Sequence, residues 1–272
     1  MMYGVIIVSK DLLKQSTEIV SHKTTIAELK VRKSKALGMG GKDKLKALNL
    51  RGVLNARERI EYLLDQNTFI ETGLFSTSHR KEVQHKTPAD GKISGFGKIH
   101  KRPVALVSND FTVLGASSSV INGKKMKHIK EAANKRGLPV IFLAESAGAR
   151  MPDRMGAPGR AILGQDPLEY RRDRKTPWVS ALLGPCFGSS TWYACLSDFV
   201  VMKKGAILAV ASNKVTSIAI KQEVDSEELG GWKLHSTVTG LVDRVVEDDK
   251  EALDEIKKFL SYFPSHNNEL PP

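Results

Sequence analysis

Short apolar runs, separated by glycines and by charged stretches with helical spacing, are the main pattern along this chain. The run from Leu138 to Ala144 follows Gly137 and ends at Glu145, which is typical of a buried parallel strand. The run from Trp178 to Leu183 has the same character. Shorter strands are expected over residues 68–74, 92–99, 104–108, 198–202, 206–210 and 241–246.

Helical spacing of apolar residues marks the remaining elements. Asn55 is expected to cap a helix that continues to Leu64. A helix over residues 119–135 is expected to end at Gly137, because glycine readily adopts the left-handed conformation that closes helices. Further helical segments are expected at residues 227–229 and 248–262.

Composition divides the chain into three parts. Residues 1–50 are basic, with a glycine-rich break at 38–41, and predict a helical N-terminal arm. Residues 51–268 hold the expected strands, and residues 269–272 form a linker-like tail. Residues 150–176 are rich in Arg, Asp, Gly and Pro and are expected to form a mobile surface loop. The 272 residues suffice for one large α/β domain or two small ones.

Positive charge narrows the possible ligands. The chain carries 42 Lys and Arg against 30 Asp and Glu, and residues 1–60 alone hold 13 against 5. Such an excess attracts nucleic acid, an anionic membrane, or a small polyphosphate such as a nucleotide or coenzyme A. Nucleic acid is disfavoured because no aromatic residues interleave the basic cluster. No apolar run reaches the roughly 20 residues of a membrane span, and Cys186 and Cys195 lack metal-ligand spacing, so a cytoplasmic protein with reduced thiols and no metal is expected.

Two strand ends lead into small residues, at Ser146–Ala149 and Gly184–Ser190. Main-chain N–H groups at such turns, helped by a helix N-terminus, can stabilise an oxyanion such as the enolate of a thioester. An ordinary strand-to-helix turn has the same composition, so this alternative stays open. Other signatures are absent: Ser146 has no G-x-S-x-G context, no Walker lysine follows a glycine loop, and the histidines lack metal spacing.

Several motifs in a fixed order make the chain similar to a known family. They are Ala56–Asp65, Asp90–Gly91, Asn109–Ser117, Glu145–Arg150, Gly184–Gly188, Glu228–Gly231 with His235 and Gly240, and Val246–Asp249. Over residues 30–268 the chain resembles the N-terminal half of the carboxyltransferase subunit of biotin-dependent acyl-CoA carboxylases, of the propionyl-CoA and methylcrotonoyl-CoA type.

The resemblance implies a crotonase-like α/β fold of stacked β-β-α turns and a carboxyl transfer from carboxybiotin to the α-carbon of an acyl-CoA. Carboxybiotin would release CO₂, and its freed ureido nitrogen would take the α-proton. The expected partners are acyl-CoA, a biotin carboxyl carrier or biotin carboxylase subunit, and a homologous C-terminal half, within a homo- or hetero-oligomer. No nucleic acid, membrane or metal is expected. By similarity, the oxyanion donors fall on Ala147, Gly148, Gly188 and Ser189. The implied substrate-binding residues are Gly115, Ala116, Ser117, Ser146, Arg150, Arg32, Lys33 and Lys35.

The chain departs from the family pattern at three points. Ala147 replaces the first glycine of a Gly-Gly pair, so a positive φ there would be strained. Ser189 and Ser190 replace small glycines, and the homologous second half is expected from elsewhere. An acyl-CoA or malonyl-thioester decarboxylase subunit, a CoA-binding subunit without turnover, and a nucleic-acid-binding protein remain as alternatives. If the turn acts as expected, Gly148→Val abolishes activity while leaving thermal stability largely intact.

Overall fold

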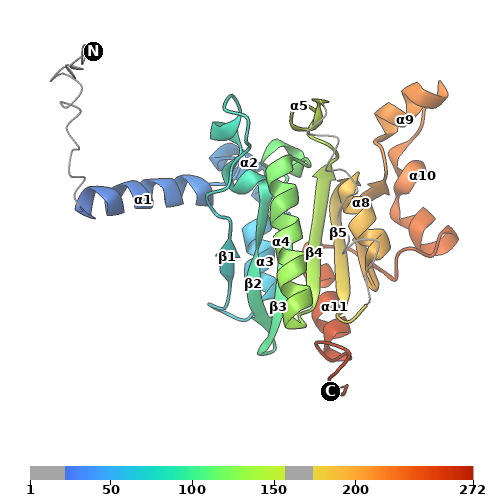
Figure 1. Ribbon diagram of the computed structural model, residues 1–272. Helices are drawn as coiled ribbons and strands as arrows, with labels where there is room; N and C mark the ends of the chain where they lie inside the picture. Colours follow the sequence, from blue (N-terminus) through green and yellow to red (C-terminus); the bar gives the residue numbers. More distant parts are fainter. Residues whose placement is uncertain (1–21, 157–173, 272) are drawn as a thin grey trace, which may run out of the picture.

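The computed structural model describes residues 22–156 and 174–271, which form a mixed α/β fold around one sheet (Figure 1). The sheet contains eight strands in the order β1-β2-β3-β4-β5-β6-β8, and β7 pairs with β5. The strands are β1 (Ile70–Thr72), β2 (Lys92–Ile99), β3 (Arg102–Asn109), β4 (Val140–Ala147), β5 (Trp178–Phe187), β6 (Phe199–Lys203), β7 (Ile207–Ala209) and β8 (Arg244–Val246). Pairing is antiparallel from β1 to β3 and parallel in the rest of the sheet.

Helices cover both faces of the sheet. The α-helices are α1 (His22–Leu37), α2 (Lys42–Leu50), α3 (Ala56–Leu63), α4 (Val120–Arg136), α5 (Met151–Arg154), α8 (Ser189–Leu196), α9 (Asn213–Ile220), α10 (Ser226–Gly230) and α11 (Asp249–Ser261). Short turns η2 (Gln84–Lys86), η3 (Pro88–Gly91) and η4 (Leu114–Ala116) and the π-turn η5 (Leu234–Val238) connect them. No helix in the described ranges is long and apolar enough to cross a membrane.

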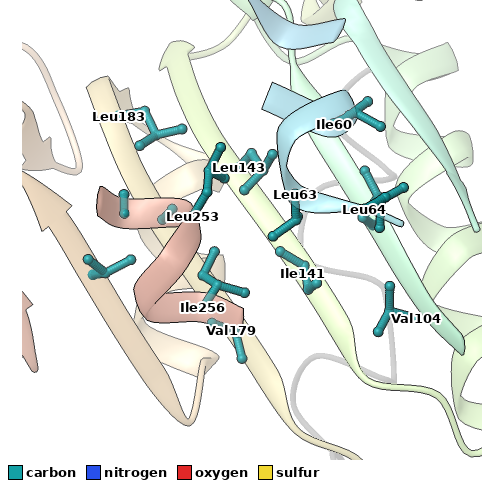
Figure 2. Packing of buried hydrophobic residues seen from close by; sticks show 14 of the residues in the cluster. Ile60, Leu63, Leu64, Val104, Ile141, Leu143, Val179, Leu183, Leu253 and Ile256 are labelled. Atoms are coloured by element: carbon teal, nitrogen blue, oxygen red, sulfur yellow. The ribbon is translucent and has the colours of Figure 1, made fainter. Parts of the chain in front are cut away.

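The alternation of side chains along β4 explains the two layers. Ile141 and Leu143 point to the face covered by α3 and α11, where they join the largest apolar cluster (Figure 2). Val140 and Phe142 lie in a second cluster with Ile129 of α4. Because both faces are buried, β4 reads as a continuous apolar run rather than an alternating one.

The predicted helix boundaries are confirmed where the sequence carried capping signals. The Asn55 side chain accepts hydrogen bonds from the backbone N–H groups of Arg57 and Glu58. The Glu58 carboxylate accepts from the Asn55 backbone N–H, which completes a capping box. Ser119 caps α4, which ends at Gly137 with φ 68°. Two strands extend beyond their expected ends: β4 continues past Ala144 to Ala147, and β5 continues past Leu183 to Phe187. The short strands β1 and β8 cover only part of the predicted runs.

The described part of the basic arm consists of α1 and α2, separated by the predicted glycine break (Figure 1). The break allows close packing, since a Cβ atom at Gly40 would lie 2.2 Å from the carbonyl oxygen of Thr112. The Gly40 N–H donates to Thr112 Oγ1 at 2.9 Å, and Lys44 Nζ donates to Thr112 O at 2.7 Å. The arm is therefore fixed to the segment that precedes η4. Most of the loop predicted at residues 150–176, namely 157–173, lies outside the described residues.

Candidate active site

The two predicted turns lie side by side at the carboxyl ends of neighbouring parallel strands. Ala147, the last residue of β4, pairs with Phe187, the last residue of β5. Each strand is followed by a glycine with positive φ, 93° at Gly148 and 65° at Gly188. A Cβ atom on Gly188 would lie 3.4 Å from Gly148 Cα and 4.0 Å from Ala149 N. The two turns therefore lie next to each other, and glycine suits both positions because of their positive φ.

The main-chain N–H groups of the two turns differ in their availability. The Gly148 N–H donates to Ser146 Oγ at 3.1 Å, and the Gly188 N–H donates to the carbonyl oxygen of Val210 at 3.2 Å. In the described part of the chain, the N–H groups of Ala149 and Ser189 have no acceptor. Ser189 opens α8, so its N–H lies at the positive end of the helix dipole. The free donors thus lie one residue after each glycine.

The expected strain at Ala147 is absent from the structure. Ala147 is not among the described non-glycine residues with positive φ, because it still belongs to β4. Its methyl group faces Gly115, where a Cβ atom would lie only 2.8 Å away. Gly115 is the centre of η4, in which Leu114, Gly115 and Ala116 all have positive φ. A third turn, predicted as substrate-binding, therefore packs against the first.

Serine hydroxyls join these turns. The Ser118 N–H donates to Gly148 O at 2.8 Å, and the hydroxyls of Ser118 and Ser189 lie 2.7 Å apart. Ser146 Oγ, which accepts from Gly148, lies 3.5 Å from Ala116 O. Of the residues predicted for this site, the turn residues therefore converge, and Ser118 is an addition that only the fold reveals.

Arg150 is enclosed by protein partners. Its guanidinium lies 2.5 Å from Asp90 Oδ1, with side-chain exposures of 5% and 0% for the two residues. Its Nε and second terminal nitrogen contact Ser117 Oγ and Ser117 O at 3.2 and 3.3 Å. The other oxygen of Asp90 accepts from the Ser119 hydroxyl and the Asn122 N–H. These contacts engage the polar side-chain atoms of Arg150 and Ser117 within the protein, and the substrate-binding role implied for them stays a prediction.

Two buried lysines hold the carbonyl groups of the left-handed turns. Lys125 Nζ donates to Ala89 O at 2.9 Å and also to Lys92 O. Lys92 Nζ donates to Asn109 Oδ1 at 3.0 Å and lies 3.5 Å from Ala116 O. Burial lowers the pKa of Lys92 to about 7 and that of Lys125 to about 8, and nearby Asp90 only partly offsets this.

These lowered pKa values predict a protein whose stability rises with pH. The folded chain releases protons from these lysines from pH 7 upward, whereas an unfolded lysine keeps its proton to about pH 10. Between these values the unfolded state binds more protons, so the free energy of unfolding increases with pH. Urea titrations at about pH 7 and about pH 9 measure this slope. Lys92→Met is expected to flatten it, and the exposed Lys127→Met to leave it unchanged; equal slopes in all three proteins would contradict the assignment.

A cleft of about 750 Å³ lies between the arm and the segment that precedes β2. Of the three basic residues of the arm that are predicted to bind substrate, Arg32 and Lys35 line it, whereas Lys33 does not. In the described chain its walls carry no carboxylate, and Leu114 of η4 forms part of its lining, so the cleft reaches the turn next to Ala147. Several further basic residues of the cleft were not predicted from the sequence, although the first of them lies three residues after the glycine break: Lys44, Lys81, His85 and Lys86.

Histidine and cysteine serve other purposes in the described ranges, where no group of three or more His, Cys, Asp or Glu side chains could hold a metal ion. His235 is buried, with Nε2 at 2.8 Å from Leu208 O and Nδ1 at 3.1 Å from Thr239 Oγ1. His79 lies 3.6 Å from Asp153, and His85 belongs to the basic cleft, whereas His128 lies on α4. Cys186 and Cys195 are free thiols, and burial raises the pKa of Cys186.

Comparison with known proteins defines the class of this fold and site. The family model of the carboxyl transferase domain matches residues 48–272, and the chain belongs to this family. This result confirms the family indicated by the motifs.

Individual relatives agree with this assignment. The chain is 34% identical to a propionyl-CoA carboxylase carboxyltransferase subunit of Haloferax mediterranei, covering 91% of this chain and 48% of that protein. It is 31% identical to the methylmalonyl-CoA decarboxylase subunit alpha of Propionigenium modestum, with the same coverage. The transcarboxylase 12S structure, a hexamer assembly with methylmalonyl-coenzyme A bound, superposes with a TM-score of 0.81 at 29% identity, over 93% of this chain and 50% of that one. The chain spans about half the length of the curated relatives it matches.

Proposed function

We propose that this chain is the acyl-CoA-binding part of a biotin-dependent acyl-CoA carboxyltransferase, in which the contacting turns after β4 and β5 hold an enolate. The observation that carries the proposal is that the Gly148 and Gly188 turns lie side by side, which brings the free N–H groups of Ala149 and Ser189 into one region. Two such donors stabilise negative charge on a thioester oxygen, and each is worth about 2.7–4 kcal/mol in related sites.

The basic cleft supports coenzyme A as the carrier of the acyl group. Its lysines and Arg32 match a polyphosphate, whereas Met39, Leu74 and Phe75 offer apolar walls for an adenine ring. The cleft reaches Leu114, and the neighbouring Gly115 packs against Ala147. A ligand bound in the cleft can therefore extend toward the free N–H groups.

Among residues 22–156 and 174–271, no side chain stands out as a base at the turns. Glu145, the carboxylate closest in sequence, lies 2.5 Å from Arg59, which also bonds Asp249 at 2.9 Å. This pairing holds the Glu145 side chain against Arg59. The residues therefore fit a reaction in which the base comes from outside. When bound, carboxybiotin on a partner carrier would supply both the carboxyl group and a basic ureido nitrogen.

The finer features of the proposal follow the family resemblance. They are a crotonase-like superhelix of β-β-α turns over residues 51–268, a separate arm at 1–50, a tail at 269–272 and a cytoplasmic location. A homologous second half, a biotin carrier with its carboxylase, and an oligomeric assembly would complete the active site. No nucleic-acid partner or membrane contact belongs to this proposal.

A decarboxylase subunit is the second candidate, since the relative from Propionigenium modestum matches over the same share of the chain. Both reactions need the same stabilised enolate. CO₂ release from methylmalonyl-CoA and malonyl-CoA, measured with and without the biotin-carrying partner, separates them. Carboxyl transfer that depends on the biotin carrier is expected, whereas decarboxylation without biotin would favour the second candidate. A CoA-binding subunit without turnover has lost its main support, because Ala147 is unstrained.

The cleft predicts different effects for two lysines of α1. Lys35→Ala is expected to raise the Kd for coenzyme A about tenfold, because Lys35 lines the cleft and a charge-assisted contact to phosphate is lost. Lys33→Ala is the matched control on the same helix and is expected to change the Kd by less than about twofold. Titration calorimetry at one fixed salt concentration measures both. Equal losses at the two positions would place the coenzyme outside this cleft.

A further inference from the structure

Asn109, the last residue of β3, contacts the strand before one turn of the proposed site and the helix after the other. Its Nδ2 donates to Glu145 O at 2.8 Å and lies 3.3 Å from Ser190 Oγ. Glu145 precedes the Gly148 turn on β4, and Ser190 follows the Gly188 turn at the start of α8. Asn109 is only 5% exposed, so these contacts form inside the protein.

The position of Glu145 explains why its carbonyl group is available. The register between β4 and β5 shifts between Ala144 and Ser146, and Glu145 has no partner residue on β5. An unpaired carbonyl group in the interior is costly unless another donor reaches it. The Asn109 amide is the donor that reaches it, from the opposite neighbouring strand.

Glu145 and Lys92 together fix the orientation of this amide. A carbonyl oxygen can only accept, so the Asn109 NH₂ group must face Glu145 O, and the Asn109 oxygen accepts from Lys92 Nζ at 3.0 Å. Lys92 is fully enclosed beside Asn109 on the paired strand β2. In the rotated orientation, the Asn109 oxygen would face the Glu145 oxygen and the NH₂ group would face Lys92 Nζ. Only the observed orientation therefore satisfies both contacts.

We propose that Asn109, oriented by Lys92, is a positioning residue that sets the distance between the Gly148 turn and the Gly188 turn. Its amide bonds the strand that presents the first turn and the helix that follows the second. The inference rests on the proposed function for its effect on turnover, whereas its structural part can be tested without activity.

Asn109→Asp is the sharpest variant, because it keeps the acceptor for Lys92 and the size of the side chain but places an oxygen against Glu145 O. With the complete carboxylase partner set, kcat is expected to fall about 100-fold, as for a comparable misplacement of catalytic groups. The KM for acyl-CoA is expected to stay within about threefold, because other residues line the cleft. Ser180→Ala, which removes an equally buried hydroxyl that bonds Ser197 at 2.7 Å, is the control and keeps wild-type kcat.

Hydrogen–deuterium exchange of the full chain tests the structural part separately. Asn109→Asp is expected to accelerate exchange about tenfold in residues 145–150 and 187–192 together, with α11 unchanged. Acceleration in only one turn, or in neither, overturns the inference, as does a kcat close to that of the wild type. If the wild type itself shows no turnover with all partners, the proposed function fails and the exchange result alone decides. If Asn109→Asp does not fold, Lys92→Met releases the amide and is judged by the same criteria.

Discussion

Gly148→Val is expected to lower kcat for carboxyl transfer at least about 100-fold, the cost of losing one oxyanion donor. A side chain on Gly148 would start 3.7 Å from Phe187 Cβ, an ordinary contact, so the surrounding fold can accept it. A β-branched residue at φ 93° would, however, shift the backbone of the turn and with it the Ala149 N–H. Steady-state kinetics with the complete partner set measures the loss.

The same substitution also strains the backbone, because φ at Gly148 is 93°. We expect a loss of about 1–3 kcal/mol in the free energy of unfolding from this cause. Gly205→Val separates strain from function, since Gly205 has φ 79° and nothing within 4 Å of its Cβ position. This control should lose similar stability and keep its kcat. A fully active Gly148→Val protein would remove the turn from the active site.

Arg150→Met is expected to destabilise the folded chain by about 3–5 kcal/mol, the cost of leaving one member of a buried ion pair without its partner. Asp90 is completely buried and would keep only the Ser119 and Asn122 contacts. The loss would also free Ser117, next to the η4 turn. Urea unfolding at about pH 7, monitored by circular dichroism, measures the change.

An exposed ion pair provides the control for this prediction. Lys127 and Glu131 of α4 lie 3.7 Å apart with side chains about half exposed, and Lys127→Met is expected to cost less than about 0.5 kcal/mol. If Arg150→Met were as mild as Lys127→Met, the Asp90 carboxyl would not be a buried charge that needs Arg150. In that case Arg150 would be available to a ligand, as the family resemblance implies.

Local signals in the sequence were sufficient for most elements of the fold. The buried strand at 138–144 and the caps at Asn55 and Ser119 depend on neighbouring residues, and the structure contains them. The ends of β4 and β5 could not be read in this way. Ser146, Ala147 and Pro185 have little strand propensity. Ser146 and Ala147 are held in β4 by pairing with β5, and Pro185 is held in β5 by pairing with β7.

The candidate site was predictable in its location but not in its atoms. Small residues after two strands indicated where the main chain is accessible. Which N–H groups are free depends on acceptors far away in the sequence. The Gly188 N–H, for example, donates to the carbonyl oxygen of Val210. The role of Asn109 likewise depends on a register shift at Glu145 that no local pattern encodes.

The basic arm was likewise predictable in the kind of ligand it favours but not in the cleft that it forms. Its excess of Lys and Arg predicted an anionic ligand, and Arg32 and Lys35 line the cleft. The opposite wall comes from residues 74–89, which carried no distinguishing pattern. The arm meets this wall because Gly40 and Lys44 bind Thr112, a tertiary contact that spacing alone cannot reveal.

Main-chain N–H groups of the turns after β4 and β5 are proposed to hold the thioester oxygen. A crystal structure of the chain with its complementary half and a non-reactive acyl-CoA analogue tests this most directly. We expect the acyl carbonyl oxygen within about 2.7–3.1 Å of the Ala149 or Ser189 nitrogen. An acyl group bound away from both turns, with these N–H groups still facing solvent, would contradict the account.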